Sequence, residues 1–71
     1  MEIIIPKSWH KVNGDDAMTY GQLLYIDKLR TAENCEGWDF PSKTNAMRSL
    51  TKLDAAKIIA TLVAGNKVII Q

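Results

Sequence analysis

Apolar positions in the second half of the chain recur with the period of an α-helix. They return every three or four residues and so share one face: Ala55, Ile58, Ile59 and Leu62. Thr51 precedes them and can cap the first turn, while Gly65 follows and can adopt the left-handed conformation that ends helices. The pattern predicts a helix over about 51–64 whose apolar face supplies most of the core.

A second helical pattern begins at Thr19. Thr19 and Gln22 match a capping box, in which each side chain accepts a hydrogen bond from the other residue's backbone N–H. The residues expected on its buried face are Gln22, Tyr25, Ile26 and Leu29. Gly21 weakens the first turn by about 1 kcal/mol relative to Ala, and we attribute its presence to another backbone passing close by. This pattern predicts a helix over about 19–31.

Short β-branched runs lie near both ends of the sequence. Residues 3–5 and 68–70 are expected to be strands that pair with each other and bring the chain ends together. Residues 8–12 can continue the first strand beyond Pro6. Pro41 and Ser42 predict a short helical turn near 43–48. The predicted fold is therefore α+β, a single domain over residues 1–71 in which two packed amphipathic helices accompany a small sheet of the two terminal strands.

The connection between the two helices carries Trp38 and Phe40. Two large aromatic side chains exceed what a solvated loop needs, so we expect them to fold back over the helix pair. In so short a chain, aromatic residues either complete the core or present a surface to a partner. On the second interpretation, Trp9 and Trp38 are the candidate partner-binding residues.

Composition narrows the classes of protein. A chain of 71 residues with a 46% hydrophobic fraction favours one folded domain over a disordered segment. There is no apolar run of about 18 residues to span a membrane, and the N-terminal residues lack the basic and apolar regions of a signal peptide. The single cysteine, Cys35, excludes a disulfide within the chain and a four-cysteine zinc site. These features predict a cytoplasmic location.

Charge is distributed unevenly along the sequence. Residues 12–40 hold six acids and two bases, whereas residues 41–71 hold five bases and one acid. Either the two halves attract each other or one side faces a partner. Four of the bases surround the starts of two predicted helical segments, where free N–H groups and cations attract phosphate. These candidate nucleic-acid-binding residues are Lys43, Arg48, Lys52 and Lys57, and the alternative is an ordinary solvated face.

No set of residues with catalytic or metal-binding spacing is found in the sequence. His10 is the only histidine, and Cys35 lies between Glu33 and Glu36, which disfavour a thiolate. Asp15 and Asp16 follow a turn signal and are expected to be solvated. We therefore expect no enzyme activity, no cofactor and no metal site.

The two predicted helices carry the pattern T-x-x-Q-x-x-Y-I-x-x-L and, after a linker, L-T-K-x-E-A-x-x-I-I-x-x-L. Residues 19–29 and 50–62 match it, with Asp54 in place of the usual Glu. The chain thus resembles a small helix-pair module of phage and mobile-element proteins, although the aromatic linker and the terminal strands depart from that pattern. The resemblance implies a phage or prophage context, hence the host cytoplasm, and provides no catalytic residues.

These observations predict a small, phage-like, non-enzymatic binding module that engages a host or phage protein. The alternative is a nucleic-acid-binding accessory module that uses the basic face. A homodimer through the edges of the terminal strands is compatible with either function.

Overall fold

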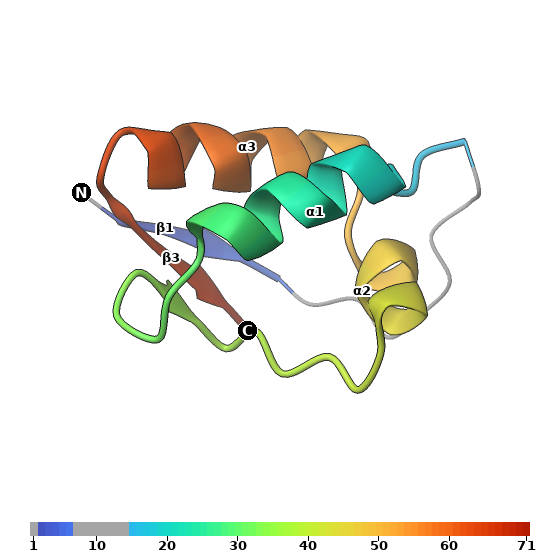
Figure 1. The fold of residues 1–71 in the computed structure, drawn as a ribbon, viewed down its shortest axis with the longest axis horizontal. Helices are drawn as coiled ribbons and strands as arrows, with labels where there is room; N and C mark the ends of the chain where they lie inside the picture. Colours follow the sequence, from blue (N-terminus) through green and yellow to red (C-terminus); the bar gives the residue numbers. More distant parts are fainter. Residues whose placement is uncertain (1, 7–14) are drawn as a thin grey trace.

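The computed structural model describes residues 2–6 and 15–71, which form three helices and a three-stranded sheet, with α1 and α3 on one face of the sheet and α2 beyond the strand ends (Figure 1). This confirms the predicted α+β fold with its two packed helices and paired terminal strands. The elements in chain order are β1 (Glu2–Ile5), α1 (Tyr20–Leu29), β2 (Cys35–Glu36), α2 (Lys43–Ser49), α3 (Lys52–Val63) and β3 (Lys67–Ile70). The sequence pattern did not predict β2.

The central strand of the sheet is β3. It pairs in parallel with β1, with Ile3 beside Val68 and Ile5 beside Ile70, as the two β-branched runs predicted. Parallel pairing places residues 2 and 71 at opposite ends of the strand pair, since the Gln71 N–H donates to the Ile5 carbonyl at 2.9 Å. The expectation that the chain ends meet was therefore wrong.

The other neighbour of β3 is the two-residue strand β2, also in parallel register. The Val68 N–H donates to the Asn34 carbonyl at 2.8 Å just before β2 begins. On the surface, the Lys67 ammonium lies 2.9 Å from the Glu36 carboxylate. The hydrogen bond to Glu36 and the charge of that carboxylate raise the pKa of Lys67.

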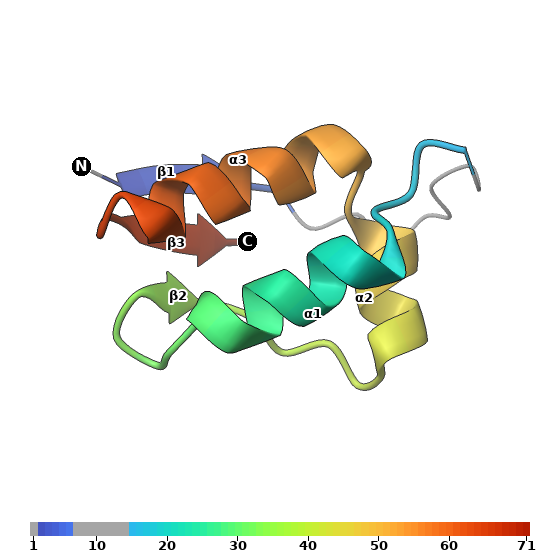
Figure 2. The ribbon, with the colours of Figure 1, turned by 45° about the horizontal axis from the view of Figure 1, so that its top comes forward.

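Helices α1 and α3 start side by side and run in the same direction (Figure 2). An isolated antiparallel bridge joins Ala17 to Thr51, immediately before the two helices. The Lys52 N–H donates to the Asp16 carbonyl at 2.7 Å, and the Gln22 side-chain amide donates to the Lys52 carbonyl at 3.4 Å. The starts of both helices are therefore held together by one backbone hydrogen bond and one bond from a side chain to the backbone.

Each of these helices begins with a capping box, as the sequence predicted. At α1, Thr19 Oγ1 accepts from the Gln22 N–H at 3.1 Å, and Gln22 Oε1 accepts from the Thr19 N–H at 3.0 Å. At α3, Thr51 and Asp54 make the same exchange at 3.0 and 3.1 Å. These four bonds satisfy N–H groups that have no partner within a helix.

The core lies between the helix pair and one face of the sheet. Ile26 of α1, Ile58 of α3 and Val68 of β3 are fully buried, and each contributes about 1.5–3 kcal/mol by leaving water. Leu29 and Ile59 pack against the same cluster as predicted. Tyr25 was wrongly placed on the buried face and is 47% exposed, because it lies about 100° around the helix from Ile26.

The two connections in the sheet have opposite hands. The chain leaves β1, passes through α1 to β2, and then returns through α2 and α3 to β3 between the first two strands. Since α1 and α3 cover the same face, the outward and return crossovers cannot both be right-handed (Figure 2). Both crossovers involve β2, and we attribute this exception to the small number of residues that β2 pairs.

Two glycines occupy positions that other residues disfavour. Gly37 follows β2 with φ +85°, and a Cβ atom there would lie 1.9 Å from the Ile70 carbonyl oxygen. Gly65 ends α3 with φ +80°, but its Cβ position is open. The atom nearest a Cβ at Gly21 is Thr19 Oγ1 at 3.9 Å, so within residues 2–6 and 15–71 no other segment's backbone comes within 4 Å of that position, contrary to the expectation.

Alanine substitutions at these three glycines should have graded effects on the free energy of unfolding. Gly37→Ala should lower it by well over 2 kcal/mol, because a steric clash with β3 adds to the cost of a left-handed conformation. Gly65→Ala should cost about 1–2 kcal/mol, since only the conformational term applies. Gly21→Ala should be neutral or should stabilise by up to about 1 kcal/mol. Urea denaturation followed by circular dichroism measures all three, and equal losses at Gly37 and Gly65 would contradict this order.

Candidate binding groove

A groove of about 220 Å³ opens between α1, the connection that follows β2, and α2. Its lining combines buried apolar groups, two aromatic rings, two cations and one carboxylate: Leu23, Asp27, Arg30, Trp38, Phe40, Ser42, Lys43 and Ala46. Leu23 and Ala46 are each 1% exposed and come from the core side. The groove therefore offers apolar and charged contacts within one small volume.

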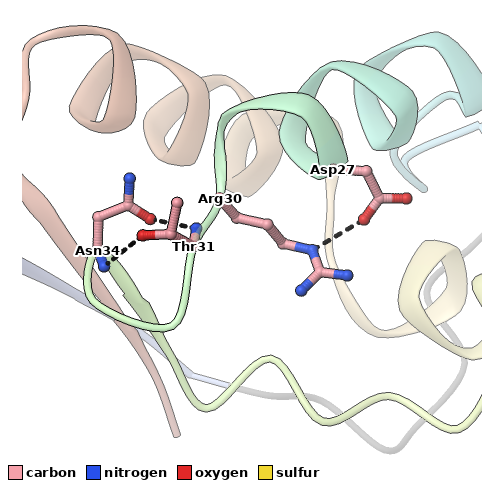
Figure 3. Close-up of polar contacts among 4 residues, drawn as sticks. All are labelled: Asp27, Arg30, Thr31 and Asn34. Carbon is pink, nitrogen blue, oxygen red and sulfur yellow. Dashed lines mark hydrogen bonds and ion pairs between the residues drawn. The ribbon is translucent and has the colours of Figure 1, made fainter.

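A tight turn after α1 directs the chain from Arg30 back into the sheet (Figure 3). Asn34 organises this turn. Its side-chain oxygen accepts from the Thr31 N–H at 2.6 Å, and its side-chain amide donates to the Leu29 carbonyl at 3.1 Å. Its own N–H donates to Thr31 Oγ1 at 3.2 Å. The turn thereby places Arg30 beside the aromatic residues that leave β2.

Arg30 is held on two sides. Its Nε donates to the Asp27 carboxylate at 2.8 Å, and its guanidinium carbon lies 5.1 Å from the centre of the Trp38 ring. Asp27 is one turn earlier on α1, so the ion pair follows from helical spacing. Figure 3 shows that Nε makes the hydrogen bond to Asp27, so this bond does not use the two terminal guanidinium nitrogens. Those nitrogens form a fork suited to a second anionic group.

Trp38 and Phe40 form one wall of the groove. Their rings meet edge to face with centroids 5.1 Å apart, and both side chains pack partly buried against the core. The aromatic residues thus fold back against the core as expected, but the groove that they line is shared with α1 and α2, and no α3 residue lines it, so they do not cover the predicted helix pair. Trp38 thus packs against the core and also lines the groove. The sequence had left open whether it completes the core or presents a surface to a partner.

Lys43 begins α2 at the mouth of the groove. Its ammonium lies 5.8 Å from the centre of the Tyr20 ring, which belongs to the first turn of α1. Ser42 caps α2 as predicted, since its hydroxyl accepts from the Asn45 N–H at 3.2 Å. The Ser42 hydroxyl thus serves as a helix cap. The charged side chains of the groove are Arg30, Lys43 and Asp27, and Asp27 is paired with Arg30.

The four predicted nucleic-acid-binding residues do not share this groove. Lys43 lines it, whereas Lys57 lines a separate groove beside β1. Arg48 lies in the last turn of α2, and Lys52 lies at the start of α3 next to α1. All four side chains are exposed. Exposure is expected both for residues that contact nucleic acid and for an ordinary solvated face, so it does not distinguish the two.

Of the two candidate partner-binding tryptophans, only Trp38 lies in the described part of the chain. Trp9 and His10 fall outside the described residues, as does the predicted strand continuation over 8–12. The role of Trp9 therefore stays a prediction.

Cys35 is buried in the core and has no disulfide partner. Burial raises the pKa of its thiol, and the positive charge of Arg30 offsets part of that rise. Both the sequence and the structure therefore indicate an unreactive thiol, although the cause is burial and not the neighbouring carboxylates.

Residues 2–6 and 15–71 contain no cluster of three histidine, cysteine, aspartate or glutamate side chains that could hold a metal ion. Among the same residues, no helix is long and apolar enough to cross a membrane.

In comparisons with known proteins, no family model, no curated protein and no solved structure matches the chain. The resemblance to a phage helix-pair module thus stays a prediction.

Sequence reasoning did not identify Arg30 and Asp27 as groove residues. Their spacing of three residues at the end of a predicted helix was a usable signal for an ion pair. The approach of Trp38 to Arg30 depends on the return of the chain through β2, which the sequence pattern did not reveal.

Truncation of Trp38 should destabilise the domain. Trp38→Ala should lower the free energy of unfolding by about 2 kcal/mol, less than the 3–5 kcal/mol typical of a fully buried aromatic residue, because the ring is only partly buried. Tyr25→Ala removes an exposed aromatic ring of α1 and should cost less than about 1 kcal/mol. Chemical denaturation of both variants measures the difference, and equal small losses would assign Trp38 to the surface.

Proposed function

We propose that this chain is a non-enzymatic binding module that engages a protein partner through the groove between α1 and α2. The partner segment would carry an acidic side chain next to an apolar one. The observation that carries the proposal is the guanidinium of Arg30, which donates to Asp27 through Nε (Figure 3) and lies over the Trp38 ring, so that the ion pair does not use its two terminal nitrogens.

Preorganisation of Arg30 supports a role in recognition. A free arginine side chain loses about 1.5–2 kcal/mol of rotamer entropy when it is immobilised. The bond to Asp27 and the stacking on Trp38 have already restricted this side chain, so less entropy remains to be lost on binding. A carboxylate of the partner can then accept two parallel hydrogen bonds from the terminal nitrogens.

Apolar surface next to Arg30 supports recognition of the apolar side chain in the proposed partner segment. Leu23, Trp38 and Phe40 line the groove and can accept an aliphatic or aromatic side chain. Tyr20 and Leu24 lie one turn apart on the outer side of α1 and are 53% and 43% exposed. Lys43 over the Tyr20 ring connects this exposed pair to the mouth of the groove, which extends the contact area.

Two features favour a protein over a nucleic acid. One face of Trp38 is covered by the Arg30 guanidinium and so is withdrawn from base stacking. The four bases that could contact phosphates lie at separate places, with Lys57 beside β1 and Lys43 beside α1.

A binding role also fits the chemistry of the lining. Asp27 is already paired with Arg30, the Ser42 hydroxyl accepts a hydrogen bond as a helix cap, and no histidine lines the groove. A cytoplasmic setting and the phage-like context remain parts of the proposal, supported by the single buried thiol and by the sequence resemblance.

Selection from a random peptide library on the immobilised domain tests the proposal. Enriched peptides should carry Asp or Glu beside Leu, Phe or Trp. Arg30→Gln should weaken binding of such a peptide by about 10–100-fold, because a hydrogen bond to a charged group contributes about 1.5–3 kcal/mol. Titration calorimetry measures the dissociation constant.

Lys28→Gln is the matched control, since it removes a positive charge from the same helix outside the groove lining. It should change the affinity less than about twofold. Equal losses for the two variants would mean that binding responds only to net charge. Tight binding to duplex or single-stranded DNA that is lost in Arg48→Glu/Lys52→Glu but kept in Arg30→Gln would overturn the proposal in favour of the nucleic-acid alternative.

A further inference from the structure

Lys43 is the cation of the groove that the single acidic side chain of the proposed partner leaves without an anion. The lining carries two cations and one carboxylate, and that carboxylate, Asp27, is paired with Arg30. Within residues 2–6 and 15–71, Lys43 forms no ion pair, and its ammonium lies 5.8 Å from the centre of the Tyr20 ring. An ammonium has three N–H donors, and a cation–π contact is not a hydrogen bond, so these donors can serve a ligand.

The two cations lie toward opposite ends of α1. Lys43 lies over Tyr20 in the first turn of this helix, whereas Arg30 follows its last turn and bonds to Asp27. At about 1.5 Å of helix rise per residue, Tyr20 and Asp27 are separated by about 10 Å along the axis. The anionic groups of a partner that contacts both cations must therefore lie roughly 10 Å apart.

An extended peptide provides this spacing at its C-terminus. Alternate side chains of an extended chain share one face, and residues two positions apart are separated by about 7 Å. An acidic side chain two positions before the last residue and the α-carboxylate of that last residue then span roughly 7–10 Å. The side chain of the last residue lies on the same face, between the two carboxylates.

We propose that the groove receives the C-terminal end of its partner, in which an acidic residue, any residue and a final apolar residue precede a free α-carboxylate. The inference rests on the proposed function, because the acidic side chain stays on Arg30 while the α-carboxylate binds Lys43. The final apolar side chain meets Leu23, which lies on α1 between Tyr20 and Asp27 and lines the groove. The charged and apolar groups of the peptide thus follow the same order as those of the groove.

The size of the groove favours a chain end over a segment that continues. At about 30 Å³ per water, its volume of about 220 Å³ holds about seven waters, which matches one large side chain with its carboxylate. A chain that continued past Lys43 would bring further peptide N–H and C=O groups against the lining, and each group that loses water needs a hydrogen-bond partner. A chain end carries its second anion and its apolar side chain on one residue, so it contacts Lys43 and Leu23 without such groups.

Titration of the whole chain with two matched peptides tests the inference. The probes are acetyl-Gly-Ser-Asp-Ser-Leu with a free carboxylate and the same peptide with a C-terminal amide, and chemical shifts of the backbone N–H groups give both dissociation constants. The amide should bind at least about tenfold more weakly, because it lacks the charge that Lys43 receives. Equal constants would overturn the inference. An amidated peptide with a second Asp after the Leu that binds as tightly as the free acid would also overturn it, because Lys43 would then receive a side chain.

Lys43→Gln should weaken binding of the free-acid peptide by about tenfold and binding of the amide by less than about twofold. Lys52→Gln is the matched control, because Lys52 begins α3 after a threonine cap just as Lys43 begins α2 after a serine cap, and Lys52 lies outside the groove lining. It should change neither constant more than about twofold. Equal losses for the two peptides in Lys43→Gln would contradict a contact with the α-carboxylate.

Arg30→Gln separates this inference from the proposed function. It should weaken binding of both peptides by about tenfold or more, because both carry the acidic side chain. If both peptides bind through Arg30 with equal affinity, the proposed function stands and only the chain-end inference falls. If neither peptide binds in a way that depends on Arg30, both fall.

Discussion

Parallel pairing of β3 with both β1 and β2 is the constraint on which the rest of the structure depends. Parallel strands cannot be joined by a tight turn, so each connection must carry the chain back to the end of the sheet where the strands begin. Helices α1 and α3 make those returns on the same face, and they consequently run parallel to each other and start together. The bridge between Ala17 and Thr51 and the two capping boxes lie at that shared start. The local signals that begin the helices thus also align them.

Much of this fold could be predicted because its signals are local. Thr19 with Gln22 and Thr51 with Asp54 specify helix starts within four residues, and Ile58 and Leu62 specify a buried face by spacing alone. The short strand β2 could not be predicted in this way. Two residues carry no periodicity, and β2 exists because β3 presents a second edge to it. Tyr25 shows the same limit, since the exact rotation of α1 depends on what packs against Leu23 and Ile26.

The candidate groove depends almost entirely on this non-local strand. Trp38 reaches Arg30 because β2 pairs with β3 and Gly37 then turns with a positive φ where any Cβ would meet the Ile70 carbonyl. The presence of Trp38 and Phe40 in one connection predicted that their side chains fold back onto the domain. It did not predict that Trp38 would meet Arg30. Conversely, the basic residues that are close in the sequence are separated in space, because α2 and α3 are distinct helices with a cap at Thr51 between them.

The groove lies on the side of the helix pair toward β2, whereas α3 covers the β1 side (Figure 2). A groove of this size contacts only a few side chains, so contact area alone would give weak binding. The affinity of the proposed site would then depend on how little its side chains reorganise when a partner binds. The ion pair with Asp27 and the Trp38 ring already restrict Arg30 before binding, and the turn that Asn34 holds after α1 positions all three residues.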